Sequence, residues 1–103
     1  MTHHYYNIKG EPISQAEGLE WYGPRNSERQ VAKTKLESGE EVSTVFLVIN
    51  HAFGDGPPIL FETMIFGGEY DQECVRYTTL AYALVGHGKV CGLLQEGKNP
   101  WGE

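Results

Sequence analysis

The chain has 103 residues, a length that suits one domain with one hydrophobic core. Its formal net charge of −6, from 8 basic and 14 acidic residues, argues against non-specific binding to nucleic acid or to an anionic membrane surface. No apolar run is long enough for a transmembrane helix, and the N-terminus lacks the apolar region of a secretory signal. The two cysteines, Cys74 and Cys91, match no metal-ligand spacing. We therefore expect a cytoplasmic protein with reduced thiols and without a metal or cofactor.

The N-terminal third predicts a lead-in, a short helix and an edge strand. Residues 1–13 read as an extended segment that contains a turn. Ser14 and Glu17 have the spacing of a capping box, which predicts a short helix over Ser14–Tyr22. Residues Gln30–Leu36 predict a strand with two lysines on one face, and such a strand is typical of a sheet edge.

Three further strands follow. Residues Glu41–His51 are rich in β-branched residues and apolar on both faces, so they predict a central strand covered on both sides. A glycine- and proline-rich loop separates them from a strand over Ile59–Phe66, and a fourth strand is expected over Glu73–Thr78.

The C-terminal part predicts a long helix capped by Thr78 or Thr79, with Gly97 as its stop. Gly86 and Gly88 weaken this helix by roughly 1 kcal/mol each and indicate close packing or a bend. The apolar residues recur at helical spacing: Leu80, Ala83, Leu84, His87, Val90, Cys91 and Leu94. The outer side of the helix, with Tyr82, Val85, Gly88 and Gly92, is unusually apolar and indicates a partner surface.

These elements predict a single α+β domain over residues 1–103, ending in a tail over 98–103. The fold is a four-stranded antiparallel β-meander with a short N-terminal helix and with the C-terminal helix packed on one face. Because a chain of this size struggles to bury both faces of its central strand, we expect a homodimer.

The middle of the chain resembles a group of small tailed-bacteriophage proteins. Its motifs are "VSTV-aromatic-L", "H-x-F-G-x-GPP", "FETM-I/V-FGG" and "RY-x-T". Here they are carried by Val42–Phe46, His51, Phe53, Gly54, Gly56, Pro57, Pro58, Phe61–Gly68, Arg76–Thr79 and Gly86–His87. The resemblance implies a phage origin, expression in the host cytoplasm, and an accessory or counter-defence role. Sequestration of a nucleotide-derived signal is one such role, by analogy.

The loop after the central strand is the first candidate site. Its glycines can free backbone N–H groups to face an anion, but they also suit a plain hairpin loop with Gly54 and Gly56 at positive φ. His51 can contact a ligand or hydrogen-bond the loop backbone. Glu62 and Arg76 lie on neighbouring strands and can form a structural ion pair, or Arg76 can hold a phosphate.

We therefore predict a non-catalytic protein that captures a small anionic, nucleotide-derived ligand. The alternative is a module that binds a host protein, and a small hydrolase using His51 and Glu62 ranks last. The predicted ligand-binding residues are Asn50, His51, Phe53, Gly54, Asp55, Gly56, Glu62, Arg76 and Tyr77.

Overall fold

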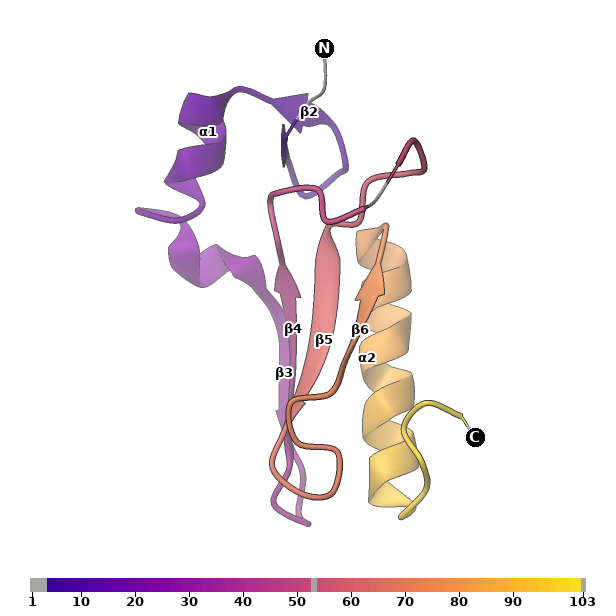
Figure 1. Ribbon diagram of the computed structural model, residues 1–103. Coiled ribbons are helices and arrows are strands. Elements are labelled where there is room, and N and C mark those ends of the chain that lie inside the picture. The colour runs from indigo at the N-terminus through magenta and orange to yellow at the C-terminus, as the bar shows by residue number, and fades with distance from the viewer. Residues whose placement is uncertain (1–3, 53, 103) are drawn as a thin grey trace.

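The computed structural model describes residues 4–52 and 54–102, which form an α+β fold (Figure 1). The elements in chain order are β1 (Tyr5–Tyr6), β2 (Pro12–Ile13), α1 (Gln15–Glu20), the 3-10 helix η1 (Asn26–Arg29), β3 (Gln30–Lys35), β4 (Glu41–Phe46), β5 (Phe61–Phe66), β6 (Cys74–Tyr77) and α2 (Leu80–Gln95). Strands β3 to β6 form an antiparallel sheet in sequence order, and α2 packs on one face of it. The predicted meander with a packed C-terminal helix is confirmed, as is the edge position of β3.

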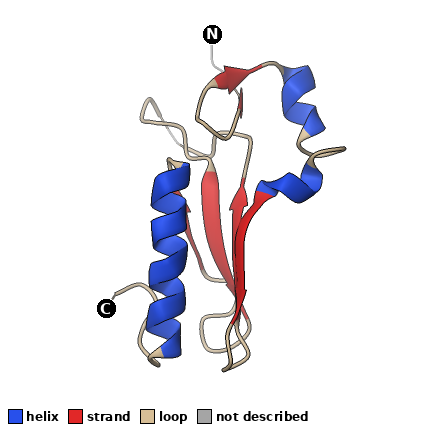
Figure 2. Ribbon diagram, turned by 180° about the vertical axis from the view of Figure 1, so that it is seen from behind, coloured by secondary structure: helices blue, strands red, loops and turns tan. Residues whose placement is uncertain are grey.

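The N-terminal elements form a small unit at one end of this sheet (Figure 2). The capping box is present: Ser14 Oγ accepts from the Glu17 backbone N–H at 3.1 Å, and the Glu17 carboxylate accepts from the Ser14 N–H. The unit is tied to the end of β4 and the residue after it, because Tyr22 Oη donates to the Leu47 carbonyl at 2.6 Å and Arg29 Nε donates to the Phe46 carbonyl at 3.0 Å. Its projection helps to make the fold elongated, with a radius of gyration of 14.5 Å.

The central strand is shorter than predicted. It ends at Phe46 rather than at His51, because Val48 adopts a left-handed backbone with φ 71° that takes the chain out of the sheet. The residues beyond it join the N-terminal sheet instead: Tyr6 N–H donates to the Val48 carbonyl at 2.9 Å, and Ile49 forms a bridge with Tyr5.

The two faces of the sheet differ, because within one chain α2 covers only one of them. The side chains of Val42, Thr44 and Phe46 are 0% exposed and lie under α2. Ser43 and Val45, on the opposite face of the same strand, are only half-buried. We call these the covered face and the open face.

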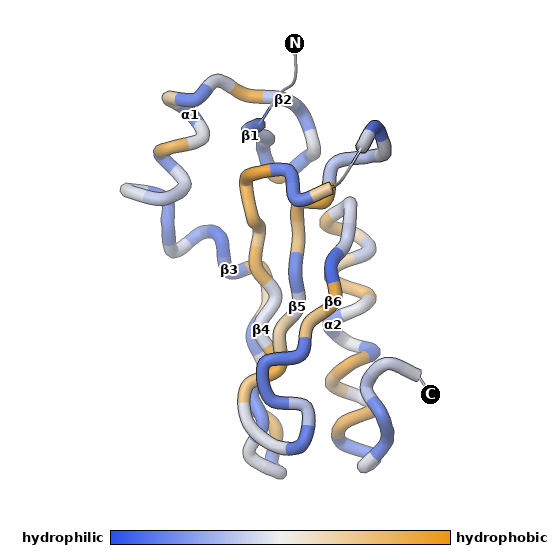
Figure 3. Tube along the Cα trace, viewed as in Figure 1, coloured by the Kyte–Doolittle hydropathy of each residue, from blue (hydrophilic) through white to orange (hydrophobic). Residues whose placement is uncertain are grey.

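The covered face consists of two apolar clusters with a polar layer between them. The aromatic cluster is built on Trp21, Phe46, Val48, Leu60, Phe61 and Ala83, and the aliphatic cluster on Leu36, Val42, Ile65, Val90, Cys91 and Leu94. Figure 3 shows hydrophobic positions recurring along α2 and along β4 and β5. Between the clusters, His87 Nδ1 and Nε2 lie 2.7 Å from Thr44 Oγ1 and 2.9 Å from Thr34 Oγ1. Thr63 completes the layer with a hydrogen bond to Thr44, so both nitrogens of the buried imidazole have partners.

Helix α2 follows the predicted pattern with one exception. Thr79 is its N-cap, accepting from the Tyr82 N–H at 3.1 Å, and Gly97 follows its end at φ 72°. Leu84, predicted on the buried face, is 46% exposed, because it lies toward the side of the helix that turns away from the sheet. The outer side is apolar and open to solvent as expected, with Tyr82 66% and Val85 73% exposed.

Candidate functional site

The loop predicted as the first candidate site is closed by Asn50, one of the predicted ligand-binding residues. Asn50 Oδ1 accepts from the backbone N–H groups of Ala52 (2.8 Å) and Ile59 (3.0 Å), so this side chain ties the two ends of the loop together. The His51 N–H donates to the Ile59 carbonyl at 3.0 Å, while its side chain is exposed. Asn50 therefore has a structural role in shaping the loop.

The tip of the loop projects into solvent. Phe53 lies outside the described residues. Gly54, Asp55 and Gly56 are exposed, and a Cβ added at either glycine would meet nothing within 4 Å. Gly54 takes the predicted positive φ of 81°, whereas Gly56 does not, so the loop needs only one left-handed glycine. Neither cavity described below is lined by loop residues.

Glu62 and Arg76 form the ion pair that their positions on adjacent strands predict. They are directly opposed across β5 and β6, and Arg76 Nε lies 2.9 Å from Glu62 Oε2. The pair lies on the open face, where burial and the nearby Glu62 raise the pKa of the Cys74 thiol. A raised pKa lowers the fraction of the reactive thiolate form. The arginine charge is balanced within the chain.

The eight predicted site residues that the structure describes do not form one cluster. Neighbouring residues of a strand point to opposite sides of a sheet, so Tyr77 lies against α2 while Arg76 lies on the open face. The loop residues lie beyond the end of β4 (Figure 1). Of the predicted residues, Tyr77 alone lines a cavity described here.

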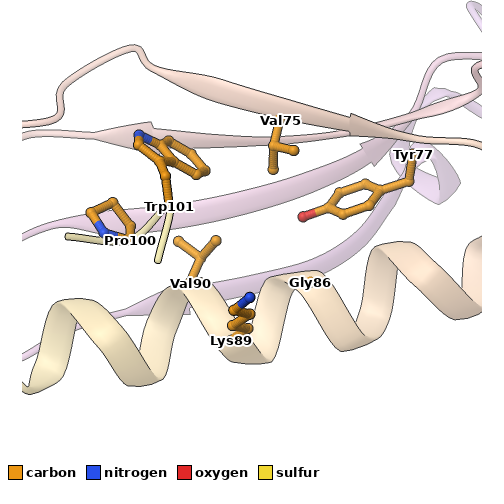
Figure 4. Close-up of a pocket in the computed structure, with 7 residues that line it drawn as sticks. All are labelled: Val75, Tyr77, Gly86, Lys89, Val90, Pro100 and Trp101. Carbon is orange, nitrogen blue, oxygen red and sulfur yellow. The ribbon is translucent and has the colours of Figure 1, made fainter. Parts of the chain in front are cut away.

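That cavity is a cleft between β6, α2 and the C-terminal segment, with a volume of about 250 Å³ (Figure 4). Most of its walls are apolar, and we call it the Tyr77 cleft. Its lining residues are Val75, Tyr77, Gly86, Lys89, Val90, Pro100 and Trp101.

Gly86 allows Tyr77 to lie flat against the helix. A Cβ at residue 86 would be 2.2 Å from Tyr77 Oη, so any side chain there would displace the ring. This close approach explains a glycine in the middle of α2, where it otherwise weakens the helix.

The segment predicted as a tail forms the other wall. Pro100 is buried, and Trp101 is held in place because its indole N–H donates to the Glu73 carboxylate at 2.7 Å. The Trp101 backbone N–H donates to Asn99 Oδ1 at 2.8 Å, which fixes the turn before it. The indole therefore lies over the cleft as a positioned side chain.

Two polar groups of the cleft have no partner among the described residues. Tyr77 Oη is buried and makes no hydrogen bond. Burial raises the pKa of Tyr77, and the nearby Thr63 hydroxyl lowers it in part by hydrogen bonding, although the two groups are outside ordinary hydrogen-bond geometry. Lys89 is exposed, and no carboxylate of residues 4–52 or 54–102 lies within ion-pair distance of it.

The lining of the Tyr77 cleft offers few reactive groups. Its lining contains a hydroxyl, an ammonium group and an indole, but no carboxylate, imidazole or thiol. Sequence reasoning named Tyr77 as a site residue and expected close packing or a bend at Gly86, but it assigned none of Gly86, Lys89 and Trp101 to a site. The available signals were a glycine within the apolar helix and a proline–tryptophan pair near the end of the chain.

The remaining surface offers little for chemistry. A second cavity of about 390 Å³, lined by Glu37, Ser38 and Gln95, is polar. In the part of the chain that the structure describes, no three metal-ligating side chains gather, and no helix is long and apolar enough to cross a membrane. Comparison of the chain with protein-family models, curated proteins and solved structures finds no match.

Proposed function

We propose that this protein is a non-catalytic binding protein that captures a small anionic ligand in the Tyr77 cleft. The observation that carries the proposal is that one apolar cleft combines a buried, unbonded Tyr77 hydroxyl with Lys89, which has no counter-ion among residues 4–52 and 54–102. A buried polar group without a partner is costly, and a ligand that bonds it recovers that cost. An apolar cleft with few polar groups is the usual form of a small-molecule site.

The cleft is a better site for an anion than the region first expected. Arg76 already has Glu62 as its counter-ion, so a ligand there would compete with an internal carboxylate. The loop offers exposed glycines, but its prolines, Pro57 and Pro58, have no N–H to donate. Within the described part of the chain, no carboxylate would have to leave Lys89 before a ligand binds it.

The biological setting follows from the resemblance to small tailed-phage proteins. A phage accessory protein in the host cytoplasm that removes a nucleotide-derived signal would need capture without turnover. The lining of the Tyr77 cleft supports such a role, because it contains no carboxylate, imidazole or thiol. Soluble expression is compatible with the absence of a spanning helix in the described residues.

A thermal-shift screen against cyclic nucleotides, nucleoside monophosphates and ADP-ribose tests the proposal. A ligand at about 100 times its Kd stabilises by about 2.7 kcal/mol, which raises Tm by on the order of 10 °C for a domain of this size. Lys89→Gln should abolish this shift. Lys98→Gln is the matched control, because Lys98 is exposed and already paired with Glu96 at 3.0 Å.

The outcomes separate the two candidate sites. A shift lost in Arg76→Ala but kept in Lys89→Gln would return the site to the open face. No shift with any of these anions would refute capture of that ligand class.

A second candidate function is favoured by the outer side of α2. Helix α2 contains no carboxylate and a single charged residue, Lys89, although the chain carries a net charge of −6. Its exposed Tyr82 and Val85 form an apolar surface of the kind that binds another protein. Val85→Glu would abolish such binding, to a host protein or to a second copy, without changing the thermal shift with ligands. Pull-down from host lysate and native mass spectrometry distinguish these two partners.

A further inference from the structure

The Tyr77 cleft has two chemically different ends. The Tyr77 hydroxyl is buried between β6 and α2, whereas Lys89 is exposed on the helix at the rim. Figure 4 shows the tyrosine ring extending along the gap, with Val75 and Val90 facing each other and Trp101 beyond them. A ligand in this cleft would therefore meet a single polar group at the inner end, apolar walls along its body, and a positive charge outside.

The volume limits what can enter. The cleft holds about 250 Å³. For scale, an apolar cavity of about 150 Å³ in another protein binds benzene, and sites for drug-sized ligands begin at about 300 Å³. One aromatic ring or two fused rings fit, whereas a complete nucleotide does not, so a charged substituent would remain outside.

We infer that the cleft takes the flat ring of a small aromatic anion, with the ring edge hydrogen-bonded to Tyr77 Oη and the anionic group held by Lys89 at the rim. This inference rests on the proposed capture function and names its ligand class. A fixed indole wall favours a flat ring, because aromatic surfaces stack with little loss of side-chain freedom. An aliphatic anion without a hydrogen-bonding edge would leave Tyr77 Oη unpaired, and sites of this kind discriminate strongly against such analogues.

Gly86 and Tyr77 act together as the specificity-determining pair. Three atoms of the tyrosine ring system, including Oη, would lie within 2.5 Å of a Cβ at residue 86. The position of the hydroxyl therefore depends on the bare backbone of α2 at Gly86. A methyl group there moves Tyr77 and changes the ring-binding end of the cleft while leaving Lys89 in place.

The test is a titration followed by tryptophan fluorescence with three probes. Adenosine 5′-monophosphate has the ring and the anion, adenosine has only the ring, and ribose 5-phosphate has only the anion. We expect the monophosphate to bind at least about tenfold more tightly than either fragment, a ratio equivalent to one charged or hydrogen-bonded contact. Trp101→Phe should remove the fluorescence change, whereas buried Trp21 should not contribute to it.

Two variants assign the contact to the hydroxyl. Tyr77→Phe should weaken the monophosphate by about tenfold and leave ribose 5-phosphate unchanged, because it removes one hydrogen-bonding group. This variant should fold normally, since the hydroxyl has no partner to lose. Gly86→Ala should weaken the monophosphate as well, and circular dichroism with a Tm measurement checks the fold of both.

The outcomes distinguish this inference from the proposed function. Equal binding of ribose 5-phosphate and the monophosphate, lost in Lys89→Gln, would overturn ring insertion but keep anion capture. Equal binding of adenosine and the monophosphate would overturn the role of Lys89 and both proposals. If none of the probes binds, indole-3-acetate is titrated as an aromatic anion outside the nucleotides; its failure would overturn the ligand class.

Discussion

The covered and open faces of the sheet use the same strands for different purposes. On the covered face, Val42, Thr44 and Phe46 are fully buried and the two apolar clusters meet α2. On the open face, side chains pair with one another across the strands: Arg76 with Glu62 at 2.9 Å, and Lys33 with Glu41 at 3.6 Å. Stability therefore comes mainly from one face, while the other is a polar surface whose charges are largely balanced.

This difference is the reason that we propose a site in the Tyr77 cleft and not at the most polar residues. A charged pair attracts attention in a sequence, but a pair that is satisfied across a sheet has no need of a ligand. The lining of the Tyr77 cleft is mostly apolar, and two of its polar groups, Tyr77 Oη and the Lys89 ammonium, lack partners in the described chain.

The two faces should differ most in the cost of losing a phenylalanine ring. Phe46→Ala, on the covered face, should lower the free energy of unfolding by about 3–5 kcal/mol, because it removes a fully buried ring. Phe66→Ala, on the open face where this ring is 43% exposed, should cost less than about 1 kcal/mol. Urea denaturation measures both. Similar losses would mean that the open face is covered in solution, as a dimer through it would require.

The polar layer of the covered face predicts an acid dependence. Burial lowers the pKa of His87 below its ordinary 6.5, so the unfolded chain binds a proton more readily than the folded chain. Stability should therefore be complete above about pH 6.5 and should fall as the pH drops below it. Urea midpoints at neutral and mildly acidic pH measure the loss.

His87→Gln should lower stability by about 1–3 kcal/mol at neutral pH, because it disturbs the threonine hydrogen bonds. It should also weaken the acid dependence. The control is His51→Gln, because His51 is exposed beside the loop. An unchanged acid profile in the His87 variant would assign the dependence to other groups.

The smallest effect is expected on the open face. Glu62→Gln should cost less than about 1 kcal/mol, because the pair is partly solvated and Arg76 remains hydrated when it is lost. The cost should shrink further at high salt, which a thermal melt at two ionic strengths measures. A loss of several kcal/mol would show that the open face is desolvated by a partner.

Local signals in the sequence predicted most of the fold. The Ser14–Glu17 capping box, the β-branched run before Phe46 and the helical spacing of Ala83, His87 and Val90 all depend on neighbouring residues, and each was confirmed. The predicted end of β4 at His51 was wrong. Val48 leaves the sheet and its carbonyl pairs with the N-terminal strand, a contact that is distant in sequence.

The candidate site was harder to predict for the same reason. Sequence placed Glu62 opposite Arg76 correctly, since both lie in regular strands. The Tyr77 cleft depends on the C-terminal segment folding back, with Trp101 bonded to Glu73 across 28 positions. No periodicity encodes such a contact, and Gly86 gains its meaning only when Tyr77 is placed beside it.

The threonine–histidine layer also fixes the position of α2 along the sheet. A shift of the helix by one turn, about 5.4 Å, would bury the imidazole among apolar side chains and leave the threonine hydroxyls without this hydrogen-bond partner. A purely apolar interface would allow several positions of the helix along the sheet, whereas the hydrogen bonds of this layer form in only one of them. Gly86 directly precedes His87, so the hydrogen bonds of His87 also place Gly86 opposite Tyr77. The shape of the Tyr77 cleft thus depends on the His87–threonine hydrogen bonds, which lie outside the cleft lining.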